Sequence, residues 1–422
     1  MRKSPAIVAL VFLNFFVLSL LSNILGPIVP DIISSFRVSL AAAAFLPFSF
    51  FIAYGVMSIP AGFLVDRLTE KPVIIASFVA ALAGALSFAM MPTYTVAVIS
   101  LFVIGAGMAA LQVAINPLLR VAGGEEHFAF NSAFAQLIFG AASFLSPLIY
   151  SYLVKNLSSQ HTSGALLKTM AAITPQDLPW VSIYWILAAS AAVMVIVVGI
   201  VRLPKVERTA DEQAGTTEMY RSLVRRPLVW LFFLCIFAYV ASEQGTANWM
   251  SKFLAQYHGF DPHVTGARAV SWFWGLMTIG CFIGMGLLKL FDSRKVLIAF
   301  SIGALVCLTA ALFGTARVSL YAFPAIGFFA SVMWPTVVSL ALNSVKEYHG
   351  SFAGILCTGI MGDAVVPFII GSLGDAFGLR TGMLVLYATF GCVLSVGFWA
   401  RPIISNITVR THDIEAESAA RT

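Results

Sequence analysis

Two carboxylates lie inside long apolar stretches of this sequence. Glu243 lies in "FAYVASEQGTANWM" and Asp363 in "GIMGDAVVPFIIG". An ionised carboxylate buried away from water is costly unless it is paired or hydrogen-bonded. No basic residue lies at the depth of either acid in its stretch. Such a group suits one of three roles: carrying a coupling ion, hydrogen bonding a polar substrate, or bonding a neighbouring helix.

A proton is the coupling ion that we expect for Asp363 and Glu243. A buried acid can gain and lose a proton as its site opens to either side of a membrane. The alternative is a sodium ion, held by both acids together with hydroxyl and carbonyl oxygens. No metal site or other cofactor is expected, because the five cysteines have no CxxC spacing and the six histidines fall in loops or the tail. No phosphate-binding or Ser-His-Asp motif favours an enzyme.

The elements that position these acids must be membrane-spanning helices. Of the 422 residues, 59% are hydrophobic and 10% are charged, whereas a soluble domain has about 25% charged residues. The alternating pattern of a membrane β-barrel is absent. We therefore predict an all-α membrane protein with twelve transmembrane helices, at about 6–30, 41–64, 72–92, 95–119, 128–154, 179–202, 228–254, 264–290, 296–314, 318–343, 351–377 and 381–402.

The connections divide the chain into two halves of six helices. With a cytoplasmic N-terminus, 18 of the 25 lysines and arginines fall on the cytoplasmic side, which favours both termini inside. The expected parts are an N-terminal bundle at 1–202, a cytoplasmic linker at 203–227, a C-terminal bundle at 228–402 and a cytoplasmic tail at 403–422. "GFLVDRLTEKPVIIA" and "GLLKLFDSRKVLIAF" each follow the second helix of a half and share a Gly and a Lys nine residues apart. Such pseudo-symmetric repeats are typical of transporters.

The first of these segments resembles a loop motif of the major facilitator superfamily. The residues that match are Gly62, Asp66, Arg67 and Lys71. We expect Asp66 to dock on the positively polarised N-terminus of the eleventh helix, and Arg67 and Lys71 to anchor the loop by pairing with acids. The resemblance implies that this motif controls conformational gating.

Further segments are similar to one branch of that superfamily, the fucose:proton symporters, which include fucose, glucose and galactose permeases. The matching segments are "LQVAINPLLRVAG", "WPTVVSLALNSV", "FWGLMTIG" and "AYVASEQGTANW". They come from both halves of the chain. The resemblance implies a sugar transporter.

The sequence departs from the branch at positions that bear on coupling and substrate. Gly26 stands where the first helix usually carries an acid, and Gln112 stands where the fucose permeases have a glutamate. Phe134 takes a usual glutamine position, with Gln136 two residues later, and Cys281 replaces an arginine. The two acids that the fucose branch would use for protons are therefore missing, which directs attention to Asp363 and Glu243.

A sugar requires amide or carboxylate side chains that form paired hydrogen bonds, and an aromatic face for its C–H surface. In apolar helices an amide side chain also commonly bonds a neighbouring helix. Gln112 and Asn116 are four residues apart and share one helix face. The candidate substrate-binding residues are Asn23, Gln112, Asn116, Asn131, Gln136, Glu243, Asn248, Trp274 and Trp334.

The expected function is uptake of a hexose or related polyol by alternating access, coupled to protons, in a bacterial inner membrane. Apart from the sugar and the lipid bilayer no partner is expected: no nucleic acid, and a monomeric state. One alternative is efflux of amphipathic molecules, because 35 Phe and 14 Met allow an adaptable apolar pocket. Sodium-coupled or uncoupled sugar transport is the other alternative.

Overall fold

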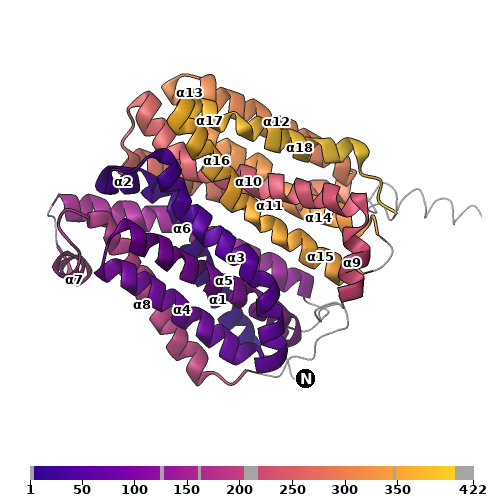
Figure 1. The fold of residues 1–422 in the computed structure, drawn as a ribbon, viewed down its shortest axis with the longest axis horizontal. Helices are drawn as coiled ribbons and strands as arrows, with labels where there is room; N and C mark the ends of the chain where they lie inside the picture. The colour runs from indigo at the N-terminus through magenta and orange to yellow at the C-terminus, as the bar shows by residue number, and fades with distance from the viewer. Residues whose placement is uncertain (1–3, 124–127, 160–162, 204–216, 346–347, 404–422) are drawn as a thin grey trace, which may run out of the picture.

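The computed structural model describes residues 4–123, 128–159, 163–203, 217–345 and 348–403, whose regular elements are all helices (Figure 1). Twelve helical runs in these ranges are long and apolar enough to cross a membrane, as predicted. They are Pro5–Phe36, Leu40–Val65, Glu70–Met90, Tyr94–Gly123, Phe134–Ser158, Pro179–Ile200, Pro227–His258, Pro262–Leu290, Ser293–Phe313, Ala316–Leu342, Ser351–Phe377 and Leu379–Trp399.

Several spans consist of more than one helical element. The first half comprises α1 (Pro5–Ser22), α2 (Leu25–Phe36), α3 (Leu40–Leu68), α4 (Glu70–Met90), α5 (Tyr94–Gly123), α6 (Phe128–Ser158), α7 (Ala165–Ile173), η2 (Pro179–Val181) and α8 (Ser182–Ile200). The second comprises α9 (Thr217–Val224), α10 (Pro227–His258), η3 (Pro262–Gly266), α11 (Ala267–Leu290), α12 (Ser293–Phe313), α13 (Ala316–Ala330), α14 (Met333–Leu342), α15 (His349–Thr358), η4 (Gly359–Met361), α16 (Gly362–Phe377), α17 (Leu379–Met383) and α18 (Val385–Trp399).

The structure differs from the predicted spans mainly at irregular points within helices. The first span runs to Phe36 rather than residue 30, and it is interrupted at Asn23. The eleventh span tightens into the 3-10 turn η4, where Gly359 and Gly362 lie directly against the α10 backbone. Apolar periodicity continues through both places, so hydropathy alone gives no sign of either one. The connections also hold two short helices, α7 and α9, that were not predicted.

Each half of the chain has its own buried core. One cluster is built almost entirely from residues of α1–α8, and the other from residues of α9–α18. In Figure 1 the indigo-to-magenta helices accordingly gather on one side of the molecule and the orange-to-yellow helices on the other. This arrangement agrees with two bundles of six spans. The predicted boundaries stay predictions, and most of the linker and tail lie outside the described residues.

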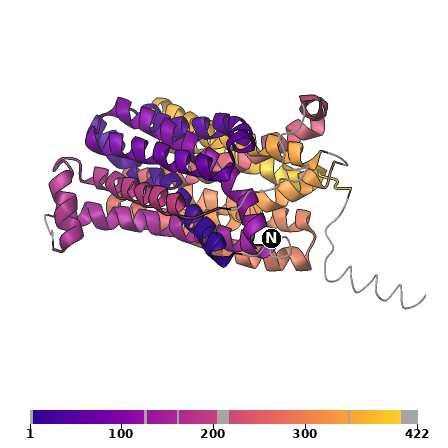
Figure 2. The same ribbon diagram turned by 90° about the horizontal axis from the view of Figure 1, so that it is seen from below.

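The spans run along the long axis of the molecule, so their ends lie on two opposite sides of the protein. We call the end where α1 begins and α18 ends the near side, and the end where α2 finishes the far side. Figures 1 and 2 place α7 and α9 at opposite ends of this axis. The short helix α7 lies at the far side and α9 at the near side.

The two halves meet through three main helix pairs, α3 with α16, α6 with α11 and α2 with α10. In the first span, α2 packs on α10 of the other half, while α1 packs on α5, α6 and α8 of its own half. α6 meets α11 around Phe144, whose carbonyl accepts a 2.7 Å hydrogen bond from the Ser271 hydroxyl. α3 lies along α16. The first span therefore packs on its own bundle through α1 and on the other bundle through α2.

Glycine allows close packing of helices inside the N-terminal half. At Gly105 on α5, an added Cβ would meet the carbonyl oxygen of Phe50 on α3, which is backbone and cannot move aside as a side chain can. At Gly199 on α8, an added Cβ would meet nothing within 4 Å. These two glycines form a matched pair for testing helix contact.

We expect Gly105→Ala to lower the melting temperature of the purified protein, since overpacking a tight contact costs about 1–3 kcal/mol. Gly199→Ala should leave the melting temperature unchanged or raise it, because alanine is the better helix former. Thermal unfolding in detergent, followed by tryptophan fluorescence, measures both. Equal melting temperatures for the two variants would contradict the α3–α5 contact.

Candidate functional site

Of the two acids of the C-terminal half, Asp363 is buried and Glu243 is half-buried, and they lie near each other. Glu243 projects from α10 and Asp363 from the first turn of α16, two helices that pack together. The Tyr239 hydroxyl, one turn before Glu243, donates a hydrogen bond of 2.5 Å to Glu243 Oε2. The charges of the two carboxyl groups act on each other. The sequence suggested such a pair, and α10–α16 packing supplies its geometry.

Asp363 is incompletely bonded. The residue is only 7% exposed, and its Oδ1 has no hydrogen-bond partner among the described residues. The ion pairs found in the described part of the chain bring no lysine or arginine to Asp363 or Glu243. Buried polar atoms are nearly always bonded in folded proteins. A buried acid oxygen without a protein partner can be satisfied by its own proton, by water or by a bound molecule.

Three more unbonded polar atoms belong to residues of the matching sequence segments. They are Asn248 Nδ2 on α10, Trp274 Nε1 on α11 and Thr336 Oγ1 on α14. Asn248 and Trp274 were predicted as substrate-binding residues, whereas Thr336 was not, although its segment was noted. Two donors and one hydroxyl, all buried, provide hydrogen-bonding capacity that the described residues do not use.

An aromatic surface flanks Glu243. The Trp334 ring lies 6.1 Å from the Tyr239 ring, centre to centre. Trp334 is half-buried and is therefore partly accessible. Trp274 is 4% exposed and packs edge-on against Phe273. Tyr239 and Trp334 therefore form an aromatic contact beside the Glu243 carboxyl group.

Asn23 bonds to protein groups from both halves. Its Nδ2 donates to Ser143 Oγ on α6 at 3.0 Å, and its Oδ1 accepts from Gln244 Nε2 on α10 at 3.2 Å. Ser19 also bonds to Ser143, which extends this buried network along α1. In this conformation Asn23 ties the first span to α6 and α10.

The other polar candidates of the N-terminal half are separated along α5 and α6. Gln112 is half-buried and Asn116 is exposed, on α5. On α6, Asn131 is half-buried with its amide group against Gly123, and Gln136 is exposed. The structure does not bring these four side chains into contact with the two acids. Their substrate role stays a prediction.

Gly26 stands where the resemblance predicts an acid, and packing explains the glycine. A Cβ at this position would meet the carbonyl oxygen of Ala247 on α10 and approach the Asn248 Cα at 3.3 Å. A side chain at position 26 is therefore incompatible with the α2–α10 contact. The close approach that glycine permits brings the first span onto the helix that carries Glu243.

The loop motif forms contacts that differ from those expected. Lys71 Nζ donates to the carbonyl oxygens of Gly199 and Val201, each at 2.8 Å, so it binds the C-terminal end of α8 rather than an acid. Arg67 is exposed, and Gly62 has no neighbour that an added Cβ would meet. The Asp66 side chain lies outside the described groups, so its docking on the eleventh span stays a prediction.

The second copy of the motif caps a helix. Asp292 Oδ1 accepts a hydrogen bond of 2.8 Å from the Arg294 backbone N–H at the start of α12, and the Arg294 side chain also pairs with it at 3.4 Å. Burial alone would raise the pKa of Asp292, but the hydrogen bonds and charge of Arg294 outweigh this and hold the pKa below its ordinary value. Both copies of the motif thus secure a helix end.

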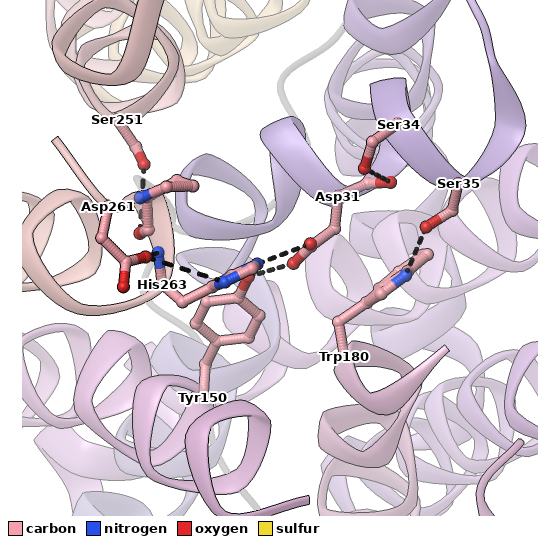
Figure 3. Close-up of polar contacts among 9 residues, drawn as sticks. Asp31, Ser34, Ser35, Tyr150, Trp180, Ser251, Asp261 and His263 are labelled. Atoms are coloured by element: carbon pink, nitrogen blue, oxygen red, sulfur yellow. Dashed lines mark hydrogen bonds and ion pairs between the residues drawn. The ribbon is translucent and has the colours of Figure 1, made fainter. Parts of the chain in front are cut away.

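A polar cluster that the sequence did not predict joins the halves at the far side (Figure 3). Asp31 on α2 accepts a hydrogen bond from the Tyr150 hydroxyl on α6, and its Oδ1 lies 2.8 Å from His263 Nε2 in η3. The predicted first span ends at residue 30, so Asp31 is expected at a span end, and His263 is one of the histidines expected in loops or the tail. Both are brought together because α2 continues beyond the predicted span end.

Asp375 forms a second far-side connection between the halves. Its two carboxylate oxygens accept hydrogen bonds of 2.8 Å each from the backbone N–H groups of Leu40 and Ala41. These donors begin α3, where free N–H groups and the helix dipole favour a negative charge. The end of the eleventh span is therefore fixed to the start of the second.

The family model described as Major Facilitator Superfamily matches residues 11–362, most of the chain. The chain belongs to the Major Facilitator Superfamily. Among curated relatives, it is 29% identical to a glucose/galactose transporter of Brucella abortus, covering 88% of this chain and 89% of that protein. It is 26% identical to the L-fucose-proton symporter of Escherichia coli, covering 86% of each. The predicted resemblance to this branch of the superfamily is confirmed.

Solved structures of the superfamily share the fold. The E. coli fucose:proton symporter FucP in the outward conformation gives a TM-score of 0.66 at 22% identity, covering 93% of this chain and 98% of that one. A bacterial homologue of the lysosomal transporter Spinster, inward-facing and unoccupied, gives 0.78 at 15% identity, covering 94% and 98%. The predicted fold class is confirmed, and the chain is a multi-pass membrane protein like other members.

Gly26→Ala should loosen the far side of this superfamily member, because the added Cβ displaces α2 from α10. We expect a cysteine at position 248, with the native cysteines replaced, to react roughly tenfold faster with a thiol reagent applied from the far side, as for a ~1.4 kcal/mol change. Gly62→Ala is the control, since its Cβ meets nothing. Equal labelling rates in both variants would exclude the close α2–α10 approach.

Proposed function

We propose that this protein takes up a hexose or related polyol by alternating access, driven by protons. The observation that carries the proposal is a pair of acids on packed helices, the buried Asp363 and the half-buried Glu243, for which the described residues supply no basic partner. Acids in such surroundings are suited to proton transfer. The relatives named for glucose, galactose and L-fucose support sugar as the cargo.

Within this proposal the residues have separate roles. Asp363, with its unpartnered oxygen, holds the transported proton, and Glu243 is its partner through their shared charge interaction. Tyr239 and Trp334 provide the aromatic face. Asn248 and Trp274 offer hydrogen-bond donors to sugar hydroxyls, and their unsatisfied atoms support this assignment.

We assign the conformation as open to the near side and take the near side as cytoplasmic. The far side holds the contacts across the halves of Asp31 with His263 and of Asp375 with the start of α3. The inward-facing neighbour also has the higher TM-score although its sequence is less similar than that of FucP. The excess of lysine and arginine at the near side supports cytoplasmic termini in a bacterial inner membrane. A monomer is sufficient for this mechanism.

The coupling ion is proposed to be H⁺ rather than Na⁺. The relative named a proton symporter supports protons, and none of the relatives reported above is named for sodium. Efflux of amphipathic molecules has less support, because the relatives reported above are named for sugars.

Uptake of labelled sugars into proteoliposomes tests the function directly. A panel of glucose, galactose, fucose and related polyols should include at least one that accumulates under an inward pH gradient. The same gradient collapsed with a protonophore, and a sodium gradient at equal pH, should give no accumulation. Failure of every sugar under every gradient would refute the proposal.

Asp363→Asn should abolish gradient-driven accumulation and retain counterflow, because the amide preserves shape and hydrogen bonding but cannot carry a proton. The measurement compares accumulation under a pH gradient with exchange at equal pH in the same proteoliposomes. Asp292→Asn, which alters an acid at the near-side surface, is the control and should accumulate sugar normally. Undiminished accumulation in Asp363→Asn would remove Asp363 from the coupling role.

A further inference from the structure

The far-side cluster places an imidazole between two carboxylates from different halves. His263 Nε2 lies 2.8 Å from Asp31 Oδ1, and His263 Nδ1 lies 3.7 Å from Asp261 Oδ1. Asp31 belongs to the N-terminal half, whereas His263 and Asp261 belong to the C-terminal half. Only the contact with Asp31 is short enough for a hydrogen bond, and Asp261 Oδ1 accepts its hydrogen bond of 2.8 Å from the His263 backbone N–H. Two carboxylates around one imidazole nevertheless attract its protonated, positively charged form. This geometry therefore favours the cationic ring while the halves are together.

The surroundings of the Asp31 carboxylate favour contact with a protonated His263. The Tyr150 hydroxyl donates to its Oδ2, so the carboxylate is held in one orientation by its own half, and His263 approaches the other oxygen. The Asp31 side chain is 11% exposed, against 35% for His263. The acid is thus shielded, while the imidazole retains contact with the far-side solvent from which a proton can come.

The surroundings supply no competing positive charge. η3 packs against α2, α6, α10 and α11. From α2 the facing group is Asp31, and from α6 it is Tyr150, whose ring lies 6.4 Å from the imidazole. From α10 it is Ser251, whose hydroxyl lies 3.5 Å from the Pro262 carbonyl oxygen. The charges that act on His263 are those of Asp31 and Asp261, and neither Lys252 on α10 nor Arg268 on α11 is among them.

We propose that Asp31 and His263 form a proton-operated latch, in which a proton taken up by His263 from the far side holds that side closed. Opening the far side separates α2 from η3 and leaves His263 without its cross-half partner. The closed state therefore binds a proton that the open state releases near neutral pH, since an unperturbed histidine titrates at about 6.5. By linkage, acid on the far side favours closure.

This inference rests on the alternating-access part of the proposed function, but not on the cargo or on Asp363. If the latch is correct, external acidity drives the transporter toward the state that delivers its cargo to the near side. This effect of pH on the conformation is separate from proton transport by Glu243 and Asp363, and the two effects would act together.

The test measures the distance between the far-side ends of the two halves as pH changes. Spin labels at Lys168→Cys on α7 and Arg317→Cys on α13, both exposed, report opening by pulsed electron resonance in nanodiscs without sugar. The native cysteines are first replaced. Between pH 8 and pH 5.5 the ratio of closed to open populations should rise roughly tenfold, the scale of one charge-assisted hydrogen bond.

Variants separate the latch from a simple structural contact. His263→Asn and Asp31→Asn should each flatten the pH response, and His263→Lys should keep the far side closed at both pH values because its charge is permanent. His258→Asn, at the far-side end of α10, is the matched control and should respond as the unsubstituted protein does. A pH-independent distance in the unsubstituted protein, or a full response in His263→Asn and Asp31→Asn, would overturn the proposal.

The readout also distinguishes this inference from the proposed function. A pH-dependent distance together with no proton-driven sugar uptake would refute the coupling proposal and leave the latch standing. Proton-driven uptake that depends on Asp363, together with a distance that ignores pH, would refute the latch alone.

Discussion

The structure depends on one constraint: a polar group buried among apolar helices needs a partner. That requirement is met across the two halves by Asn23 with Gln244 in mid-span and by Asp31 with His263 at the far side, where the exposed Asp375 also bonds the start of α3. In the centre it is only partly met, since Asp363 and several donors remain without partners. The polar groups at the far side are hydrogen-bonded when the two halves are together. The polar groups around Asp363 keep hydrogen-bonding capacity for a bound molecule.

The region of hydrogen-bonded polar groups and the region around Asp363 are connected through α10. This helix carries Gln244 toward the first span and Glu243 toward Asp363, on adjacent positions. Gly26 lets α2 rest on the same helix close to Asn248. A movement that separates α2 from α10 therefore disturbs the far-side contact and the surroundings of the central acids together.

Much of the fold could be predicted from the sequence, because hydropathy reports helices that face lipid or a core. The twelve spans, the two halves and the apolar surroundings of Glu243 and Asp363 followed from it. The interruption at Asn23 could not, because apolar residues continue on both sides of it. The extension of the first span to Phe36 could not, because Asp31, Ser34 and Ser35 are polar and indicate the end of a span. The cluster of Asp31, Tyr150 and His263 depends on three segments far apart in the chain, whose packing no local pattern reports. Lys71 bonding to carbonyls, rather than acids, was missed for the same reason.

The two charged connections at the far side run in opposite directions. Asp375 extends from the C-terminal half to backbone donors of the N-terminal half, and Asp31 extends from the N-terminal half to His263 of the C-terminal half. Each bundle thus supplies an acid that bonds to a group of the other bundle. The two halves are in this sense complementary at both connections. A hybrid transporter built from one of these bundles would need a partner bundle chosen for both positions, however well the apolar surfaces fit.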